Sequence, residues 1–234
     1  MNSAKPDRQA MTDKTTRDRI IEAADALFYQ QGYEQTSFSN IADAVGITRG
    51  NFYYHFKSKD EILDAVIETR LANTTKMLDH WEMEGARPDD RIRSFIRILI
   101  ANQVKILQYG CPVGTLCTEL AKLNHPAQAG ANQLFSLFRA WLGRQFELLG
   151  QKKDADGLAM HLLARSQGVA TLANAFHDEV FIRNEVRIMC DWLSDYAKGV
   201  MDERRSKEAT GGSEKSSSPE KAKAAKQRQP SSRR

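Results

Sequence analysis

The stretch from Thr36 to Lys59 carries side chains whose chemistry suits contact with a nucleic acid. Tyrosine, serine and threonine hydroxyls and lysine ammonium groups hydrogen-bond phosphate oxygens, whereas arginine and asparagine bind guanine and adenine edges in the major groove. If Phe52 and Phe56 face a core, the outward groups are Thr48, Arg49, Asn51, Tyr53, Tyr54 and His55. Lys59 adds charge at the amino end of a following helix, whose dipole favours phosphate. The set predicts a face that contacts DNA; the plainer alternative is that Tyr53 and Tyr54 are half-buried packing residues.

Two short helices joined by a tight turn are predicted to hold this face. One runs from Phe38 to Val45 with Ser37 as its cap, and the other runs from Thr48 to about His55. Ala42 is small enough for the helices to approach each other, and Gly46 supplies the positive φ that the turn requires. The pattern is that of a helix-turn-helix.

A second group of reactive side chains lies between Tyr109 and Leu120, where Cys111 and Cys117 flank a break that contains Gly and Pro. Either the segment is a tight turn with two small buried thiols, or the thiols sense electrophiles or oxidants. The sensor hypothesis rests on a lowered pKa for Cys117, near a helix start. The spacing of Cys111, Cys117 and His125 does not fit a zinc site, so no metal is expected.

Aromatic and polar residues on the apolar helices of the second half are candidates for an effector pocket, suited to a mostly apolar small molecule. These candidates are Trp81, Phe95, Gln103, Cys111, Cys117, Phe135, Phe138, His161, Ser166 and Asn174. For His161, a hydrogen-bonded place in the core is favoured over a ligand contact.

Composition limits the other possibilities. The 234 residues are 41% hydrophobic and 27% charged, which is ordinary for a globular protein. No stretch approaches the roughly 18 consecutive apolar residues of a membrane span. The start lacks the apolar region of a secretory signal and three cysteines favour a reducing compartment, so a cytoplasmic location is expected. No nucleophile elbow, phosphate loop, HExxH or paired-carboxylate motif appears, so we expect neither enzyme activity nor a cofactor.

Apolar residues at helical spacing predict an all-α fold of about nine helices. A flexible arm is expected at residues 1–14 and a three-helix DNA-binding domain of the helix-turn-helix type at 15–60. A larger helical domain is expected at 61–202, and a disordered basic tail at 203–234. The tail contains none of the large apolar residues and therefore cannot offset the entropy of ordering.

Several helix boundaries follow from caps and breaks. Ser58 and Glu61 are expected to form a capping box that opens a long helix. One helix is expected from Pro88 past Ile106, and a shorter one from about Thr115 to Leu123. Pro126 is placed as the first residue of the next helix. The last two helices are expected at about 154–176 and 179–201.

The net charge of +4 is unevenly distributed. Residues 203–234 hold ten Lys or Arg and four Asp or Glu, so the basic excess belongs to the tail. Residues 1–60 hold eight basic and eight acidic residues, so the DNA-binding domain is neutral and its non-specific DNA affinity is expected to be modest. The tail adds weak, salt-sensitive DNA affinity or simply aids solubility, and solubility is the favoured role.

The amino-terminal region also has a specific resemblance. Thr15 to Val66 resembles the DNA-binding domain of TetR-type transcriptional regulators. The matching segments are Arg19-Ile20-Ile21-Glu22-Ala23-Ala24, Leu27-Phe28, Gly32-Tyr33-Glu34-Gln35-Thr36-Ser37, Ile41-Ala42, Val45-Gly46-Ile47-Thr48-Arg49-Gly50-Asn51-Phe52-Tyr53-Tyr54-His55-Phe56 and Ser58-Lys59-Asp60-Glu61.

The resemblance implies a homodimeric, usually repressing regulator that binds a palindromic operator in double-stranded DNA. Its larger carboxy-terminal domain would dimerise and hold a small-molecule effector. By position, Ser37, Tyr53, His55 and Lys59 fall where the family touches the phosphate backbone, and Arg49, Gly50, Asn51 and Tyr54 fall where it approaches base edges. Release from DNA by an effector or by cysteine modification is expected. The alternative is a constitutive DNA-binding module without an effector.

Overall fold

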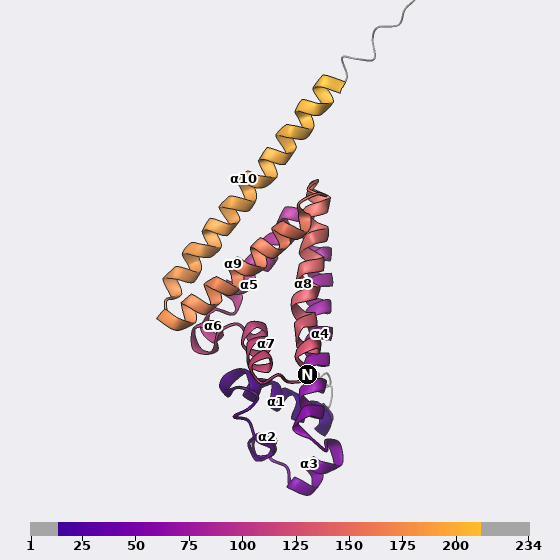
Figure 1. The fold of residues 1–234 in the computed structure, drawn as a ribbon, viewed down its shortest axis with the longest axis vertical. Helices are drawn as coiled ribbons and strands as arrows, with labels where there is room; N and C mark the ends of the chain where they lie inside the picture. The colour runs from indigo at the N-terminus through magenta and orange to yellow at the C-terminus, as the bar shows by residue number, and fades with distance from the viewer. Residues whose placement is uncertain (1–13, 212–234) are drawn as a thin grey trace, which may run out of the picture.

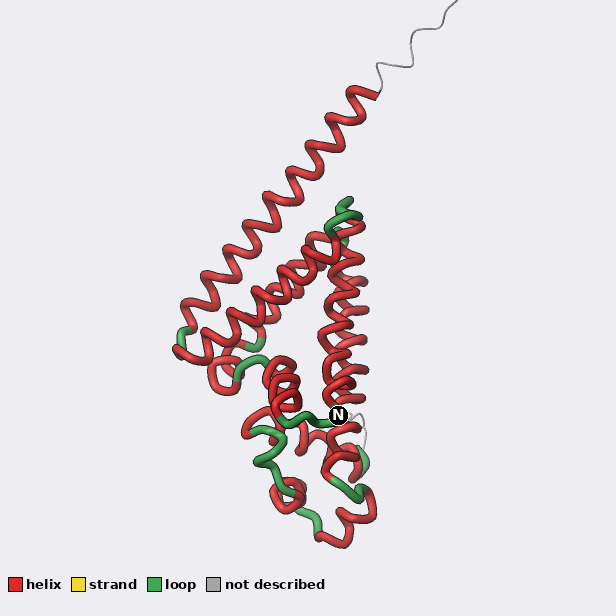
Figure 2. Tube along the Cα trace, in the orientation of Figure 1, coloured by secondary structure: helices red, strands yellow, loops and turns green. Residues whose placement is uncertain are grey.

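The computed structural model of the chain describes residues 14–211, which form ten α-helices and contain no strand. Figure 2 shows only helices and loops over this part of the chain. The predicted all-α fold is confirmed. The helices are α1 (Thr16–Gln31), α2 (Phe38–Val45), α3 (Arg49–His55), α4 (Lys59–Glu84), α5 (Pro88–Ala101), α6 (Gln103–Tyr109), α7 (Pro112–Lys122), α8 (Gln128–Leu149), α9 (Ala155–Phe176) and α10 (Glu179–Gly211).

Local hydrogen bonds explain why the first three helices begin and end where the sequence predicts. Thr15 and Ser37 each form a capping box with the residue three positions on, at the start of α1 and of α2. Gly46 ends α2 in the left-handed conformation with φ of 72°. Thr48 caps α3 by accepting the N–H of Asn51.

The buried apolar residues form two clusters. The amino-terminal cluster joins α1, α2, α3 and the first half of α4, and it also takes Leu116 and Leu120 from α7. The second cluster joins α4, α5, α6, α8, α9 and α10 and includes Leu78, Trp141 and Phe146. The single helix α4 therefore contributes to both cores. The predicted domain boundaries stay a prediction, because the cores share elements across residue 60.

Three helix boundaries differ from those predicted. The helix expected from Pro88 past Ile106 divides at Asn102, whose side-chain amide donates to the carbonyl of Ile98 at 3.0 Å, and this division accounts for the tenth helix. Helix α7 begins at Pro112, where Cys111 accepts the N–H of Gly114 at 3.4 Å. Helix α8 begins at Gln128 rather than Pro126, because a turn precedes it. In this turn, the N–H of Ala127 donates to Nδ1 of His125 and the N–H of Gln128 donates to the carbonyl of His125.

The capping box expected at the start of α4 is only half formed. Ser58 accepts the N–H of Glu61 at 3.1 Å, as predicted. The Glu61 carboxylate, however, accepts the N–H of Lys57 at 2.7 Å instead of that of Ser58. The reciprocal bond thus moves one residue outward while still satisfying a free amide at the helix start.

Helix α10 extends to Gly211, so the prediction that disorder begins at residue 203 is wrong for residues 203–211. This segment is rich in Glu, Arg, Lys and Ala, which are strong helix formers. Helical propensity therefore continues the helix through a segment that has no large apolar residue. The predicted disorder of residues 1–13 and 212–234 lies outside the described residues.

The helices place the two ends of the molecule far apart. Helices α1 to α3 gather at one end, and the carboxy-terminal end of α10 lies at the other (Figure 1). Helices α4 and α8 pack side by side between these ends, and α10 packs against α5 and α9. Among the described helices, none is both long and apolar enough to cross a membrane.

Candidate DNA-binding surface and effector pocket

Helix α3 is held to the amino-terminal core by one aromatic side chain and exposes the others. Phe52 is 1% exposed, and its ring meets the ring of Phe38 edge-on with centroids 5.0 Å apart. Tyr54 is 79% exposed, so it is not a packing residue. Tyr53 is 48% exposed, and the centre of its ring lies 5.5 Å from that of Phe38. Tyr53 therefore packs in part and remains open to solvent in part. The polar face of α3 therefore points to solvent.

Of the other residues predicted to contact DNA, some are exposed and some interact with neighbouring residues. Thr48, Arg49, Gly50 and Asn51 are exposed, and Arg49 donates to the Ser39 hydroxyl at 3.0 Å. Ser37 is exposed but caps α2, and His55 is half-buried with its ring 5.1 Å from Tyr54. These side chains lie on or beside α2 and α3, and their contact with DNA stays a prediction.

Lys59 lies differently from the position expected of a phosphate contact. Its ammonium group donates to the carbonyl oxygens of Tyr33 at 2.9 Å and Glu34 at 3.3 Å, and it lies 4.2 Å from the centre of the Tyr33 ring. Lys59 is half-buried in this arrangement. Its ammonium group therefore supports the turn between α1 and α2.

Two adjacent cavities lie among helices α1 and α4 to α9. The inner cavity has a volume of about 80 Å³, and its walls include the predicted pocket residues Phe95, Cys111, Phe135, Phe138 and Ser166. The outer cavity has a volume of about 400 Å³ and lies between α1 and helices α4 to α8. Five residues line both: Ile98, Asn102, Pro112, Val113 and Phe138. We call the two together the interdomain pocket.

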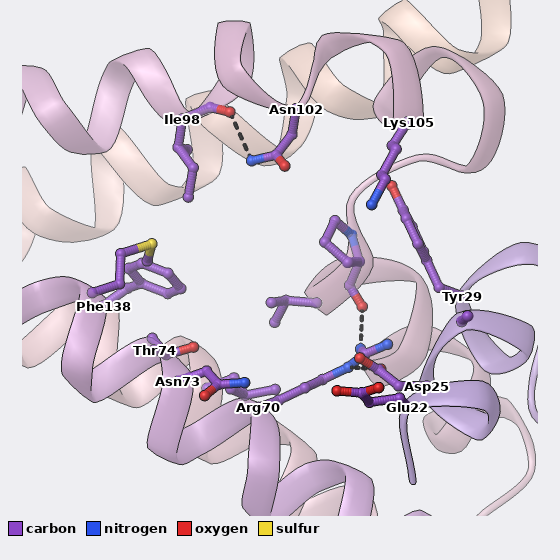
Figure 3. Close-up of a pocket in the computed structure, with 15 residues that line it drawn as sticks. Glu22, Asp25, Tyr29, Arg70, Asn73, Thr74, Ile98, Asn102, Lys105 and Phe138 are labelled. Carbon is purple, nitrogen blue, oxygen red and sulfur yellow. Dashed lines mark hydrogen bonds and ion pairs between the residues drawn. The ribbon is translucent and has the colours of Figure 1, made fainter. Parts of the chain in front are cut away.

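Arg70 is the central polar residue of the interdomain pocket (Figure 3). Its side chain is 12% exposed, and its guanidinium donates through Nε to Asp25 Oδ1 at 2.6 Å and through Nη1 to the carbonyl of Pro112 at 2.7 Å. It thereby joins α4 to α1 and to the start of α7. One half-buried cation thus links the amino-terminal helices to the rest of the molecule.

Tyr29 makes a second link across the same pocket. Its hydroxyl donates to the carbonyl of Gly110 at 2.8 Å, and its ring meets that of Tyr109 edge-on. Burial, and secondarily the neighbouring Cys111 thiol, raise the pKa of Tyr29 to about 12. The hydroxyl therefore stays protonated and remains a donor throughout the physiological pH range.

Sequence reasoning missed the polar residues of the outer cavity, which are Glu22, Asp25, Tyr29, Arg70, Asn73, Thr74, Asn102 and Lys105. Only Arg70 gave a usable signal, because it falls four residues after Val66, on the apolar stripe of α4 where a charge needs a partner. The three α1 residues are on a helix that the sequence assigned to DNA binding alone.

Five predicted pocket residues do not line the interdomain pocket. Trp81 packs on Trp141 with ring centres 5.7 Å apart. Gln103 has its Oε1 atom buried without a hydrogen-bond partner. His161 is exposed with its ring 5.4 Å from Trp192, so the expected core position for His161 is wrong. Cys117 belongs to the amino-terminal core. Asn174 lines a separate groove of about 580 Å³ beside α7 and α9.

The lowered pKa expected for Cys117 is also wrong. The side chain is buried, and desolvation raises the pKa of the thiol to about 11. The thiol therefore stays protonated near neutral pH and is a poor nucleophile. Within residues 14–211, no group of three or more His, Cys, Asp or Glu side chains is arranged to hold a metal ion.

Comparison with known proteins supports this arrangement of a helix-turn-helix and an all-helical second region. Residues 20–66 match the family described as bacterial regulatory proteins, tetR family. An uncharacterised HTH-type transcriptional regulator of Lactococcus lactis subsp. lactis is 32% identical over 125 residues, which is 53% of this chain and 64% of that protein. The match thus spans less than two thirds of that relative's length.

Two longer matches cover most of the chain. The HTH-type transcriptional regulator TtgR of Pseudomonas putida is 25% identical over 186 residues, which is 75% of this chain and 88% of that protein. The crystal structure of a TetR transcriptional regulator from Legionella pneumophila superposes with a TM-score of 0.68 at 27% identity and covers 78% of this chain and 98% of that chain. These relatives are transcriptional regulators, a class without enzymatic activity.

Proposed function

Because this chain is a TetR-family DNA-binding transcriptional regulator, we propose that it is a repressor that binds a palindromic operator as a homodimer and leaves it when a small molecule binds. Helix α3 would enter the major groove with Arg49, Asn51 and Tyr54 facing base edges. Such a protein acts on chromosomal DNA, so we place it in the cytoplasm.

The observation that carries the proposal is the shared wall of the interdomain pocket. Helix α1, which holds the helix-turn-helix, and helices α4 to α8 enclose the same space. A ligand bound there contacts both regions at once. Its affinity therefore depends on how the helix-turn-helix is oriented relative to helices α4 to α8. This difference in affinity is what allows an effector to shift the equilibrium between the two orientations.

The pocket favours a mostly apolar effector with a hydrogen-bonding end. The inner cavity is lined by aromatic and aliphatic side chains such as Phe95 and Phe138. The side chains of Asn73, Thr74 and Lys105 line the outer cavity (Figure 3). These three side chains make no hydrogen bond or ion pair within residues 14–211. A ligand with its apolar body inside would place polar groups against these side chains.

Of the two expected release routes, small-molecule binding is favoured over cysteine modification. Burial keeps the Cys117 thiol protonated, and Cys111 is half-buried with its sulfur accepting the N–H of Gly114. A constitutive DNA-binding module would need no cavity between its two regions, so the interdomain pocket also favours the effector-responsive hypothesis.

The homodimer is supported by apolar side chains exposed on the last two helices. Phe176 is 73% exposed, and Leu172, Val180 and Ile188 are also exposed along α9 and α10. A patch of this kind marks an interaction surface, and a second copy of the chain would cover it. A dimer would present two α3 helices to half-sites about one or more helical turns apart, each turn being roughly 34–36 Å.

A footprint tests the proposal. Purified full-length protein, without added compound, is expected to protect a palindromic site in DNA surrounding its own gene. Mostly apolar compounds with a polar end, added as a panel, are expected to include one that removes this protection. If no site is protected there and none is enriched from a random-sequence library, the proposed function is wrong.

A further inference from the structure

The turn between α1 and α2, residues 32–36, is held by side chains from outside α1, α2 and α3. The N–H of Tyr33 donates to Oε2 of Glu119 at 2.9 Å, and the N–H of Glu34 donates to Oε1 of the same carboxylate at 3.0 Å. Lys59 donates to the carbonyl oxygens of these two residues. One carboxylate and one ammonium group therefore satisfy all four backbone polar groups of Tyr33 and Glu34, which is how folded proteins treat backbone groups removed from water.

The close approach of Glu119 explains the glycine that ends α1. Gly32 has φ of 92°, a conformation that other residues rarely adopt. A Cβ atom at this position would also lie only 2.9 Å from Glu119 Oε1. Glycine is thus required both by the backbone conformation and by the carboxylate beside it.

The position of this turn controls the start of the helix-turn-helix. Thr36 is 1% exposed and donates to the carbonyl of Gly32 at 2.7 Å, and the next residue, Ser37, caps α2. Helix α2 packs on α3 through the amino-terminal core, in which Ile41 and Phe52 are both buried. A shift of the turn therefore reorients the surface predicted to meet DNA.

Helix α7 connects Glu119 to the interdomain pocket. Its first residues, Pro112 and Val113, line both cavities of that pocket. Glu119 follows Val113 by about 9 Å along the same helix, at a rise of about 1.5 Å per residue. A ligand that displaces the amino end of α7 therefore also moves the carboxylate that holds the turn.

We infer that Glu119 is the positioning residue through which α7 holds the helix-turn-helix in its operator-binding orientation. The inference deepens the proposed function and rests on it, since an effector in the interdomain pocket acts by moving α7 and loosening the two bonds from Tyr33 and Glu34. Hydrogen bonds to an ionised acceptor are stronger than neutral ones, so one carboxylate suffices for this role.

Two variants of the full chain remove the bonds, and a third serves as a control. Glu119→Ala removes both acceptors, and Glu119→Gln removes the charge at nearly constant size. Glu147→Gln makes the same chemical change at an exposed residue of α8 whose side chain has no hydrogen bond or ion pair among residues 14–211. Because loss of a negative charge by itself strengthens binding to DNA, weaker binding cannot be attributed to net charge.

Two measurements are made on each variant: hydrogen exchange at the amides of Tyr33 and Glu34, and affinity for a palindromic site selected with the wild-type protein. Glu119→Ala is expected to speed exchange and weaken binding by about tenfold or more, since charge-assisted bonds are lost. Glu119→Gln is expected to give a smaller loss, and Glu147→Gln to match the wild type. Unchanged amide protection, or unchanged affinity, in Glu119→Ala would overturn the inference.

The role of α7 is tested by coupling between its two ends. Val113→Trp places a larger side chain in the interdomain pocket. If circular dichroism shows that this variant is unfolded, Val113→Phe is used in its place. Either change is expected to speed exchange at Tyr33 and Glu34 and to weaken binding. Added to Glu119→Ala, it is expected to have no further effect, whereas fully additive effects would rule α7 out as the link.

Failure of this inference is distinguishable from failure of the proposed function. If the wild-type protein selects no DNA site, the proposed function fails. The exchange measurements then still report whether Glu119 holds the turn and whether bulk in the pocket loosens it. If the wild type selects a site but Glu119→Ala binds it normally, only the inference fails.

Discussion

At the scale of single residues, the molecule uses buried or half-buried charges as links between its two regions. Arg70 joins α4 to Asp25 and to the carbonyl of Pro112, and Lys59 and Glu119 enclose the turn after α1. A charge withdrawn from water is tolerated only when its partners are in place. These links are therefore sensitive to any motion that separates the partners.

Replacing Arg70 by Met is expected to lower the free energy of unfolding by about 2 kcal/mol, because the Asp25 carboxylate and the Pro112 carbonyl lose a charged donor. Urea denaturation measures the change. Arg97→Met, at an exposed residue of α5, is the matched control and is expected to stay within about 0.5 kcal/mol of the wild type. Equal effects of the two substitutions would show that Arg70 is not a structural link.

Cys117 is expected to resist alkylation in the folded protein at pH 8, because burial raises its thiol pKa to about 11 and leaves little thiolate. Mass spectrometry after iodoacetamide treatment gives the extent of reaction at each cysteine. Reaction at Cys117 should increase as the pH rises toward that pKa. Rapid, selective modification of Cys117 at pH 8 would restore the sensor hypothesis.

At the scale of elements, local signals predicted what local hydrogen bonds decide. Thr15, Ser37 and Gly46 mark helix ends with their own side chain or backbone, so the bounds of α1 to α3 could be found in the sequence. The roles of Asp25 and Tyr29 depend on which helices meet in three dimensions. The exposed polar face of α3 could be predicted because that motif is short and contiguous, whereas the pocket is assembled from separate helices.

Replacement by alanine is expected to change the stability of the protein in opposite directions at Gly46, which precedes α3, and at Gly50, which lies within it. Gly46→Ala places a side chain at φ of 72° and is expected to destabilise the protein by about 1–2 kcal/mol. Gly50→Ala lies in the helix with open space around it and is expected to stabilise the protein by up to about 1 kcal/mol. Thermal unfolding of both variants compares them, and a loss of stability in both would argue against the conformation assigned to the turn.

At the scale of the whole molecule, the surface proposed to bind DNA and the excess of basic residues are separated. The basic segment 203–234 begins within the last turns of α10, whose carboxy-terminal end lies at the opposite end of the molecule from α3 (Figure 1). The residues around α3 belong to a region without net charge. In the proposed function, selectivity would therefore come from a few positioned groups that a dimer presents twice.

Deleting residues 203–234 is expected to leave the preferred DNA sequence unchanged. Loss of a segment with ten basic residues should at most weaken binding and flatten its dependence on salt. Site selection and titrations at several salt concentrations measure these two properties separately. A changed sequence preference would mean that the assignment of recognition to α3 is wrong.

The most direct measurement is a titration of the full-length protein onto its selected palindrome and onto the same DNA with one half-site scrambled. The account predicts two chains on each intact site, and a loss of affinity on the scrambled DNA that approaches the gap between specific and non-specific binding, on the order of a thousandfold or more. Equal affinity for the two DNAs, or one chain on the intact site, would contradict it.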